Sequence, residues 1–504
     1  MPARKSPSKG GKSAQKVEDK RKPPSQSQGT ENRVFSAPKT IQLIGLAILL
    51  LVLTATYSPI SQLTLSPVYG SVPSAAFHQR GMMVAALSGW FAKDQIRKRL
   101  STKIMNVLPV LAFTIPTIQF FLFMRSAQLG VVYGPLLTEL LTYFPLVFLS
   151  VSSVAMLLED ADLRRTLQKF VGILLPGYIG KNALMARIPL QLITASLYAI
   201  SLPSKWLLLA LPPLLFSSGY NVHFPFKHTT ALLNSTLQAE DFVLLHREES
   251  LTGYLSVLEN VKEHYRVMSG LGIGTTPTAL VNHGIDTTVV EIDPAVLHLA
   301  EDYFSLPKNF TPVIQDAVKF VDEASRATPA PTFDYIVHDV FTGGVEPVSL
   351  FTIEFMKGLR SLLKEDGVIA INYAGDLTLP SSGLIVRTIR AVFPSCRIFR
   401  ESEPPADTRE GDFTNMVIFC KLTDSPLEFR NTTDADFLGS KSREAYLMPQ
   451  LEIDAASFAK AEDGQQDVLA EGQVGDLVRW HSQSAAGHWS IMRTVLPHVI
   501  WENW

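Results

Sequence analysis

Cysteine is scarce in this chain, with two residues, Cys396 and Cys420, among 504. So few cysteines exclude a disulfide framework and a multi-cysteine metal site. His481 and His488 have no Cys or His at a spacing that suits a metal, so we predict no metal. Because both cysteines fall on a predicted hairpin, we expect them to pack and not to catalyse.

Charge is also scarce. Charged residues make up 18% of the chain and hydrophobic residues 46%, and the mean hydropathy is +0.16. Soluble domains usually carry about 25% charged residues. The composition therefore indicates that part of the chain lies in a membrane.

The first 39 residues are predicted to be a disordered basic tail. Nine Lys or Arg and three acidic residues occur within residues 1–33, and the rest is largely Ser, Pro, Gly and Gln. Such a composition buries too little apolar surface to fold. A basic tail before an apolar run is typical of a topogenic signal or a contact with anionic lipid. We therefore expect the lipid bilayer, and not nucleic acid, as its partner.

Residues 40–226 are predicted to form a transmembrane region of about six helices. Uncharged runs of 21 and 19 residues match the ~20 residues that cross a bilayer. An interfacial segment is expected over Phe170–Gly180. The predicted spans are Ile41–Tyr57, Gly81–Ala92, Ile104–Met124, Leu140–Leu158, Ile188–Pro203 and Trp206–Ser218.

Basic residues in two short loops predict the orientation. Lys and Arg near helix ends stay in the cytosol, which places residues 93–103 and 164–169 there. Six crossings put the N-terminus and the large C-terminal domain in the cytosol. Seven crossings put that domain in the lumen, where the sequons at Asn234, Asn309 and Asn431 are open to glycosylation.

Glu139 is the acidic residue that lies beside an apolar run. A carboxylate in a membrane is a candidate functional site. The interpretation favoured by the sequence is a helix end or a headgroup position. Because the spans show no paired ionisable residues, the sequence does not support a transporter.

After Lys227 the pattern changes to short β-branched runs alternating with amphipathic helices, which is typical of a parallel α/β sheet. We expect a small β-rich element at 227–268, a Rossmann-like nucleoside-binding domain at 269–422 and a C-terminal extension at 423–504. The predicted strands are Thr287–Asp293, Pro312–Gln315, Phe333–Val340, Gly367–Tyr373, Cys396–Glu401 and Asn415–Lys421. The predicted helices are Pro277–His283, Pro294–Leu306, Ala317–Ser325, Leu350–Leu363 and Gly383–Phe393.

A glycine loop precedes this alternation, with Gly270, Gly272 and Gly274. Glycines permit a tight turn and close backbone approach to a ligand, and Thr276 is a candidate helix cap. Glu291 follows at the end of the next strand, where a carboxylate accepts ribose hydroxyls. The dinucleotide and P-loop fingerprints both fail, so the loop favours the adenosine of S-adenosylmethionine. Asp316 is the candidate partner of the adenine amine.

With these motifs, Leu280–Leu422 resembles the spermidine/spermine synthase (polyamine aminopropyltransferase) family, a branch of the class I S-adenosylmethionine-dependent methyltransferase fold. The matching segments are VVEIDPAVLHLAEDYF, IQDAVKFV and FDYIVHDVFTGGVEPVSLFTIEFMKGLRSLLKEDGVIAIN. Asp241–Glu259 is similar to the family's small β-domain. The apolar front and the tail resemble fungal membrane proteins that carry this domain.

The resemblance implies aminopropyl transfer from decarboxylated S-adenosylmethionine to a polyamine, a small-molecule amine acceptor. Asp339, at the carboxyl end of the fourth strand, is then the general base or cation clamp. The resemblance also allows a homodimer. The interpretation without function is that Asp339 caps the following turn.

Three departures from the family pattern keep other functions open. Ile273 stands where the family has an acid in the glycine loop, and Thr342 stands where it has a second acid after the base. A segment before Gly270 is missing, leaving Tyr265–Ser269 as a short first strand. Either a mis-joined exon or a real deletion explains the gap. The alternatives are a methyltransferase that uses intact S-adenosylmethionine and a non-catalytic membrane protein that keeps the fold.

The tail holds tryptophans at 480, 489, 501 and 504. Such residues suit a membrane-interface anchor or an amphipathic helix that packs on the domain. We expect the packed helix.

Overall fold

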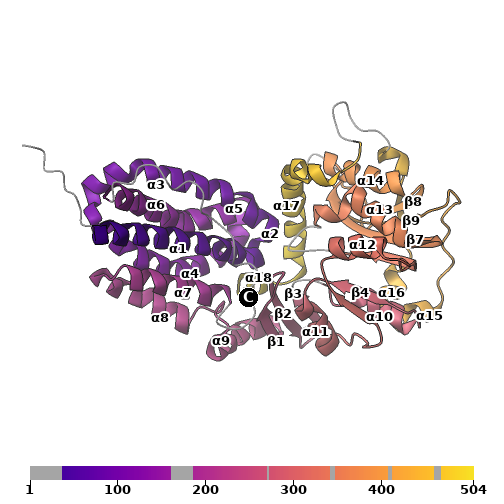
Figure 1. The fold of residues 1–504 in the computed structure, drawn as a ribbon. Helices are drawn as coiled ribbons and strands as arrows, with labels where there is room; N and C mark the ends of the chain where they lie inside the picture. Colours follow the sequence, from indigo (N-terminus) through magenta and orange to yellow (C-terminus); the bar gives the residue numbers. More distant parts are fainter. Residues whose placement is uncertain are drawn as a thin grey trace, which may run out of the picture.

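The computed structural model describes residues 37–160, 186–269, 272–340, 347–406, 411–458 and 467–503. Figure 1 shows a helical bundle beside an α/β domain, with the C-terminal helix α17 (Val478–Val495) and the strands β1 to β3 between them. The basic tail up to residue 36 and Phe170–Gly180 lie outside the described residues.

The bundle is built from long apolar helices. Three stretches are long and apolar enough to cross a membrane, namely Thr40–Tyr69, Ile104–Phe123 and Ser126–Asp160. The last of these contains two helices that meet at Thr142, so the predicted span Leu140–Leu158 belongs mainly to the second. The helices are α1 (Ala37–Tyr69), α2 (Ser71–Ala76), α3 (His78–Leu100), α4 (Val107–Phe123), α5 (Ser126–Leu141), α6 (Tyr143–Asp160), α7 (Arg187–Ser201) and α8 (Leu211–Gly219).

The predicted segments Gly81–Ala92, Ile188–Pro203 and Trp206–Ser218 are mainly helical, lying in α3, in α7, and in a 3₁₀ turn (Lys205–Ala210) followed by α8. These helices lie outside the three stretches that are long and apolar enough to cross a membrane. The bundle is therefore larger than the part that is long and apolar enough to cross a membrane.

Glu139 differs from its predicted environment. It lies in the last turn of α5, as expected for a helix end, but it is 1% exposed and its carboxylate pairs with His78 of α3. The sequence showed no paired ionisable residues inside the predicted spans, and this pair lies just outside two of them, Gly81–Ala92 and Leu140–Leu158. His78 escaped notice because it is 61 residues away in sequence and lies outside the predicted apolar spans.

A three-stranded antiparallel sheet follows the bundle. Helix α9 (Lys227–Leu237) leads into β1 (Phe242–Glu249), β2 (Tyr254–Asn260) and β3 (Tyr265–Ser269), in the order β1-β2-β3. The predicted β-rich character of Asp241–Glu259 is confirmed.

The α/β domain contains the predicted alternation of strands and helices. Parallel strands β4 (Thr288–Glu291) and β5 (Thr311–Ile314) form one sheet. A second sheet has the order β10-β8-β9-β7-β6, with β6 (Phe333–His338), β7 (Leu363–Asp376), β8 (Ser395–Arg400), β9 (Phe413–Lys421) and β10 (Leu451–Ile453). The helices are α10 (Thr275–Asn282), α11 (Pro294–Tyr303), α12 (Ala317–Arg326), α13 (Ile353–Leu362) and α14 (Pro380–Val392).

The sheet of this domain is divided where its first strand belongs. In a doubly wound sheet of order 3-2-1-4-5-6, the first strand lies between the second and the fourth. Here β4 and β6 correspond to the second and fourth strands, and no described strand joins them. Tyr265–Ser269, the predicted first strand, pairs with β2 instead, with Val267 opposite Leu258. The predicted short strand is therefore present, but it does not take the first place in the sheet of the α/β domain.

The two cysteines form a disulfide between neighbouring antiparallel strands. Cys396 of β8 lies opposite Cys420 of β9, and their Cα atoms are 4.2 Å apart. The predicted antiparallel pairing of these strands is confirmed. The cysteines were expected only to pack, but they also form a disulfide. The register of the hairpin brings their side chains together on one face.

The C-terminal helices pack between the bundle and the α/β domain. Trp489 of α17 donates from Nε1 to the carbonyl of Val68, 3.0 Å away, at the end of α1. Arg493 donates to the same carbonyl and lies over the Trp489 ring. On its other side, α17 contacts β9, where the rings of Phe413 and His488 are 6.0 Å apart. These contacts confirm the predicted packed helix, which bridges the two regions.

Candidate nucleoside site

The glycine loop leads into helix α10. Gly274 has φ 76°, a left-handed conformation that favours glycine, and it caps the helix. A Cβ atom there would lie 3.1 Å from Cδ1 of Leu306. Thr276 is thus inside the helix and is not the cap predicted for it. Gly272 is exposed, with open space around its Cα, whereas Gly270 lies outside the described residues.

Glu291 and Asp316 come together at one edge of the two-stranded sheet. Glu291 ends β4 opposite Ile314, and Asp316 follows two residues after Ile314. The Oε1 atom of Glu291 accepts a hydrogen bond from the backbone N–H of Asp293, 2.9 Å away. Partial burial raises the pKa of the Glu291 carboxyl. Both residues therefore lie at the carboxyl ends of adjacent parallel strands, as predicted.

Asp316 also has a structural role. Its Oδ1 accepts from the backbone N–H groups of Val318 and Lys319, at 2.8 and 3.2 Å, and so caps α12. The second carboxylate oxygen has no contact of this kind among the described residues. Asp316 can thus bind a ligand without giving up its cap.

Asp293 is a residue that the sequence analysis missed. It is 1% exposed and caps α11 through Oδ1. Its Oδ2 accepts from the hydroxyl of Thr252, 2.6 Å away in the turn between β1 and β2. Asp293 follows Glu291 by two residues, so this hydrogen bond fixes the β1–β2 turn close to Glu291. The Asp-Pro pair that begins α11 was a signal for the cap, but not for the contact with Thr252.

Asp339 lies at the carboxyl end of β6, in the other sheet. It is exposed, and its Oδ1 accepts from Nδ2 of Asn372, 2.9 Å away on β7. Asn372 is a second residue that the sequence did not single out. Thr342 lies outside the described residues. The structure thus places Glu291 and Asp316 at the ends of adjacent strands and joins Asp339 to Asn372. Within residues 272–340 and 347–406, no hydrogen bond or ion pair links the first two residues to the second two.

The environment of Asp339 separates it from its neighbour His338. The His338 side chain is enclosed, with ring centroids of Phe351 and Phe355 at 4.9 and 5.8 Å. Burial lowers the pKa of His338 to about 4. A neutral, enclosed imidazole cannot take part in exchange with solvent, whereas the Asp339 carboxylate faces outward and can.

The described residues include no cluster of three or more His, Cys, Asp or Glu that suits a metal ion. What they do present is a glycine-lined loop, two carboxylates at adjacent strand ends and a third carboxylate with an amide partner. Such a set fits a nucleoside, whose ribose hydroxyls and adenine amine donate to carboxylates. The α/β domain thus has a fold of the class I methyltransferase type and is joined to a helical bundle.

Comparison with known proteins narrows this class. The chain is 43% identical to the N-terminal histidine N-methyltransferase of Emericella nidulans, over 90% of this chain and 96% of that protein. Residues 256–400 match the Spermine/spermidine synthase domain. The chain belongs to the family of the Emericella protein. Its co-substrate is of the S-adenosylmethionine type, as predicted from the glycine loop.

Relatives of the aminopropyltransferase type are more distant. The polyamine aminopropyltransferase of Vibrio vulnificus is 29% identical over 36% of this chain and 59% of that protein.

Among solved structures, human methyltransferase-like protein 13 covers 39% of this chain and 82% of its own, with 22% identity and a TM-score of 0.27. Spermidine synthase from Thermotoga maritima covers 44% and 85%, with 15% identity and a TM-score of 0.28.

The alignment with the Emericella protein also contains positions that hold no residue of this chain. It spans 539 positions, although 90% of this 504-residue chain is only about 454 residues. About 85 aligned positions therefore hold no residue of this chain. The relative thus has residues that this chain lacks.

Proposed function

We propose that this protein is a membrane-bound, S-adenosylmethionine-dependent methyltransferase whose acceptor is the N-terminal histidine of another protein. The observation that carries the proposal is the similarity to the Emericella enzyme, which extends over both the bundle and the α/β domain. Ile273 in the glycine loop supports methyl transfer over aminopropyl transfer, because it offers no carboxylate to hold the amine of the decarboxylated co-substrate.

In the proposed reaction, a nitrogen lone pair of the acceptor attacks the methyl carbon of the sulfonium. The carbon–sulfur bond breaks, its electron pair stays on sulfur, and S-adenosylhomocysteine leaves. A protonated acceptor nitrogen is not a nucleophile, so it must first lose a proton. Asp339 is exposed and anchored by Asn372, which suits it to orient the acceptor nitrogen and take that proton. Glu291 would hold the ribose, and Asp316 the adenine amine.

Asp339→Asn tests the assignment of Asp339. We expect methyl transfer to a peptide with N-terminal histidine to fall about 100-fold or more, because the variant cannot accept a proton. Mass spectrometry of the peptide measures the transfer. The control is Asp334→Asn, an exposed acid of the same strand that pairs with Lys364, which should leave the rate unchanged. An unchanged rate in Asp339→Asn would remove Asp339 from the mechanism.

The acceptor itself needs a separate test. A peptide that begins with histidine should be methylated, whereas the same peptide with an acetylated N-terminus or with histidine in second place should not. A polyamine offered with decarboxylated S-adenosylmethionine provides the competing reaction. Transfer to the polyamine alone would contradict the proposal and would support aminopropyl transfer instead.

The orientation proposed for the α/β domain is lumenal, opposite to that expected from the basic loops. Disulfides persist in oxidising compartments and are rare in the cytosol, and this domain holds the Cys396–Cys420 bond. An N-terminal histidine also requires removal of the initiating segment, as happens when a signal peptide is cleaved. Asn309 and Asn431 are exposed and available for glycosylation.

Glycosidase digestion of the protein from its membrane source tests this orientation. We expect a change in mobility that is lost in the double variant Asn309→Gln, Asn431→Gln. If neither sequon is modified and both cysteines react with a thiol reagent without prior reduction, the domain faces the cytosol.

The divided sheet favours a second candidate, a non-catalytic form. Because the described residues place no strand between β4 and β6, the glycine loop lacks the support that normally aims it at the nucleoside. Calorimetric titration of the purified full chain with S-adenosylmethionine distinguishes the two candidates. Binding supports the enzyme, whereas no binding by this chain, with binding by the Emericella protein under the same conditions, supports the non-catalytic form.

A further inference from the structure

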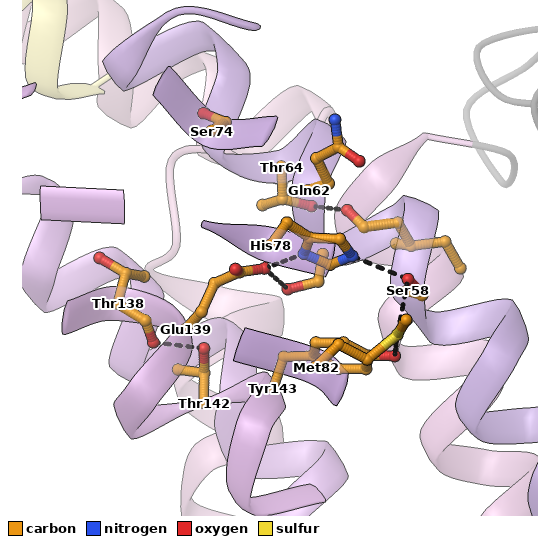
Figure 2. Close-up of polar contacts among 12 residues, drawn as sticks. Ser58, Gln62, Thr64, Ser74, His78, Met82, Thr138, Glu139, Thr142 and Tyr143 are labelled. Carbon is orange, nitrogen blue, oxygen red and sulfur yellow. Dashed lines mark hydrogen bonds and ion pairs between the residues drawn. The ribbon is translucent and has the colours of Figure 1, made fainter. Parts of the chain in front are cut away.

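The bundle contains a buried polar site built on three helices. His78 at the start of α3 lies between Ser58 of α1 and Glu139 of α5 (Figure 2). The Nδ1 atom of His78 is 2.5 Å from Oε1 of Glu139, and Nε2 is 2.7 Å from Oγ of Ser58. His78 and Glu139 are 2% and 1% exposed. Ser61 donates to the same carboxylate oxygen over 3.4 Å.

Burying two ionisable side chains has a large free-energy cost, which bulky apolar residues would avoid. Packing alone does not explain their presence. In a membrane protein, such groups usually mark a site where ions or protons bind.

The hydrogen-bond partners of His78 allow two protonation states. If His78 is neutral, Ser58 donates its hydroxyl proton to Nε2, and Nδ1–H donates to the Glu139 carboxylate. If His78 is an imidazolium, Nε2–H donates to Ser58 Oγ, and the Ser58 hydroxyl turns to the sulfur of Met82, 3.6 Å away. Both ring nitrogens have a partner in each state. A hydroxyl can donate or accept, which makes this reversal possible.

We propose that His78, Glu139 and Ser58 form a proton-binding site in the bundle that takes up and releases one proton. Uptake adds the proton to Nε2 of His78 and rotates the Ser58 hydroxyl from the ring to Met82. The charge of the His78–Glu139 unit changes from −1 to 0, and no other bond forms or breaks. This function is separate from methyl transfer, because none of these residues belongs to the nucleoside site.

The other titratable groups around the site are phenols. Tyr143 of α6 stacks on the His78 ring, with centroids 5.5 Å apart, and Tyr57 of α1 stacks on Tyr143. Glu139 is the titratable group of α5 that faces the ring, and Arg80 of α3 is exposed. The described contacts of His78 include no Lys or Arg. Glu139 therefore supplies the negative charge that holds the proton.

Ring-¹⁵N NMR of the full-length protein in lipid nanodiscs, labelled at histidine, tests the proposal. The His78→Asn variant identifies the His78 signals among the 11 histidines. Between about pH 4 and about pH 10, which spans the usual range of imidazole, we expect these signals to pass from imidazolium to neutral imidazole. A ring that stays in one charge state throughout would overturn the proposal and leave the site a purely structural contact.

Two variants test the roles of the partners. Glu139→Gln removes the charge but keeps an acceptor, and we expect it to lower the midpoint of the His78 titration by about one pH unit or more, a tenfold loss in proton affinity. Ser58→Ala should lower the midpoint by less. The hydrogen bond to Ser58 is stronger when the ring is an imidazolium than when it is neutral, so its loss disfavours the protonated state. An unchanged midpoint in both variants would contradict the site.

Two controls accompany these measurements. Circular dichroism shows whether each variant keeps the helical content of the wild type, and Ser58→Ala carries the test if Glu139→Gln does not fold. His298→Asn, at an exposed position of α11, should leave the His78 midpoint where it is. A shift in that variant too would show that the effect does not come from the site.

Discussion

The helical bundle and the α/β domain arrange buried polar groups differently. In the bundle, buried polar side chains pair across helices, as in Gln191, which donates to Gln119 of α4 and Thr64 of α1. In the α/β domain, the main core is apolar and the carboxylates lie at strand ends. In the membrane location proposed above, lipid would offer little driving force to choose between apolar helix faces, and polar pairs would then specify the partners in the bundle. In water, burial of apolar strands does this.

The largest effect is expected where the bundle meets the three-stranded sheet that lies between it and the α/β domain. Arg187 of α7 and Glu249 of β1 form a buried ion pair, with Nη1 and Oε2 2.8 Å apart and both side chains under 10% exposed. Glu249→Ala leaves the Arg187 charge buried without its partner, which should lower the free energy of unfolding by about 3–5 kcal/mol. Chemical denaturation in detergent measures this loss.

Lys364→Ala is the control for that prediction, because it breaks the exposed pair with Asp334 and should have no measurable effect. Equal losses in the two variants would show that the buried pair contributes no more to stability than the exposed pair.

His338 is a buried titratable side chain of the α/β domain. Its folded-state pKa is about 4, below the unfolded value of about 6.5. A lowered pKa means that stability is complete above the unfolded pKa and is lost as the pH falls through the folded one. Between about pH 6.5 and pH 4 we expect a loss of about 3 kcal/mol. Thermal unfolding of His338→Phe should lack this component, whereas His298→Asn should retain it.

Removing the disulfide should destabilise the α/β domain and not the bundle. Cys396 and Cys420 are 24 residues apart, so Cys396→Ala should lower the stability of the α/β domain by about 2–4 kcal/mol through loss of the crosslink. The helical signal of the bundle should persist at the same denaturant concentration. Reducing agent should produce the same change in wild type and none in the variant. A simultaneous loss of both regions would show that they unfold as one unit.

The smallest effect is expected at Asp316. Asp316→Ala removes the cap of α12 and should lower stability by about 1 kcal/mol. Asp316→Ser keeps a capping oxygen, so its stability should remain near wild type. Weaker binding of S-adenosylmethionine in the Ser variant, measured by calorimetry, would then report on the adenine contact alone. Unchanged binding would leave Asp316 with only its structural role.

Much of the fold was predictable because its signals are local. The strands β4 to β9 and the helices α10 to α14 follow from periodicity and breakers within a few residues. The same holds for the position of Glu291 and Asp339 at strand ends. Asn372 and Asp293 were not predictable, because an amide in a strand and a helix cap have no distinctive sequence signal for their partners.

The sequence by itself determined the apolar helices, the alternation of strands and helices, the glycine loop and the scarcity of charge. Tertiary structure alone decided that His78 meets Glu139, that Arg187 meets Glu249, and that β3 joins β2 and not the divided sheet. Arg493 reaches Val68 across 425 residues. Periodicity records which face of an element is buried, but it does not record which distant element covers that face.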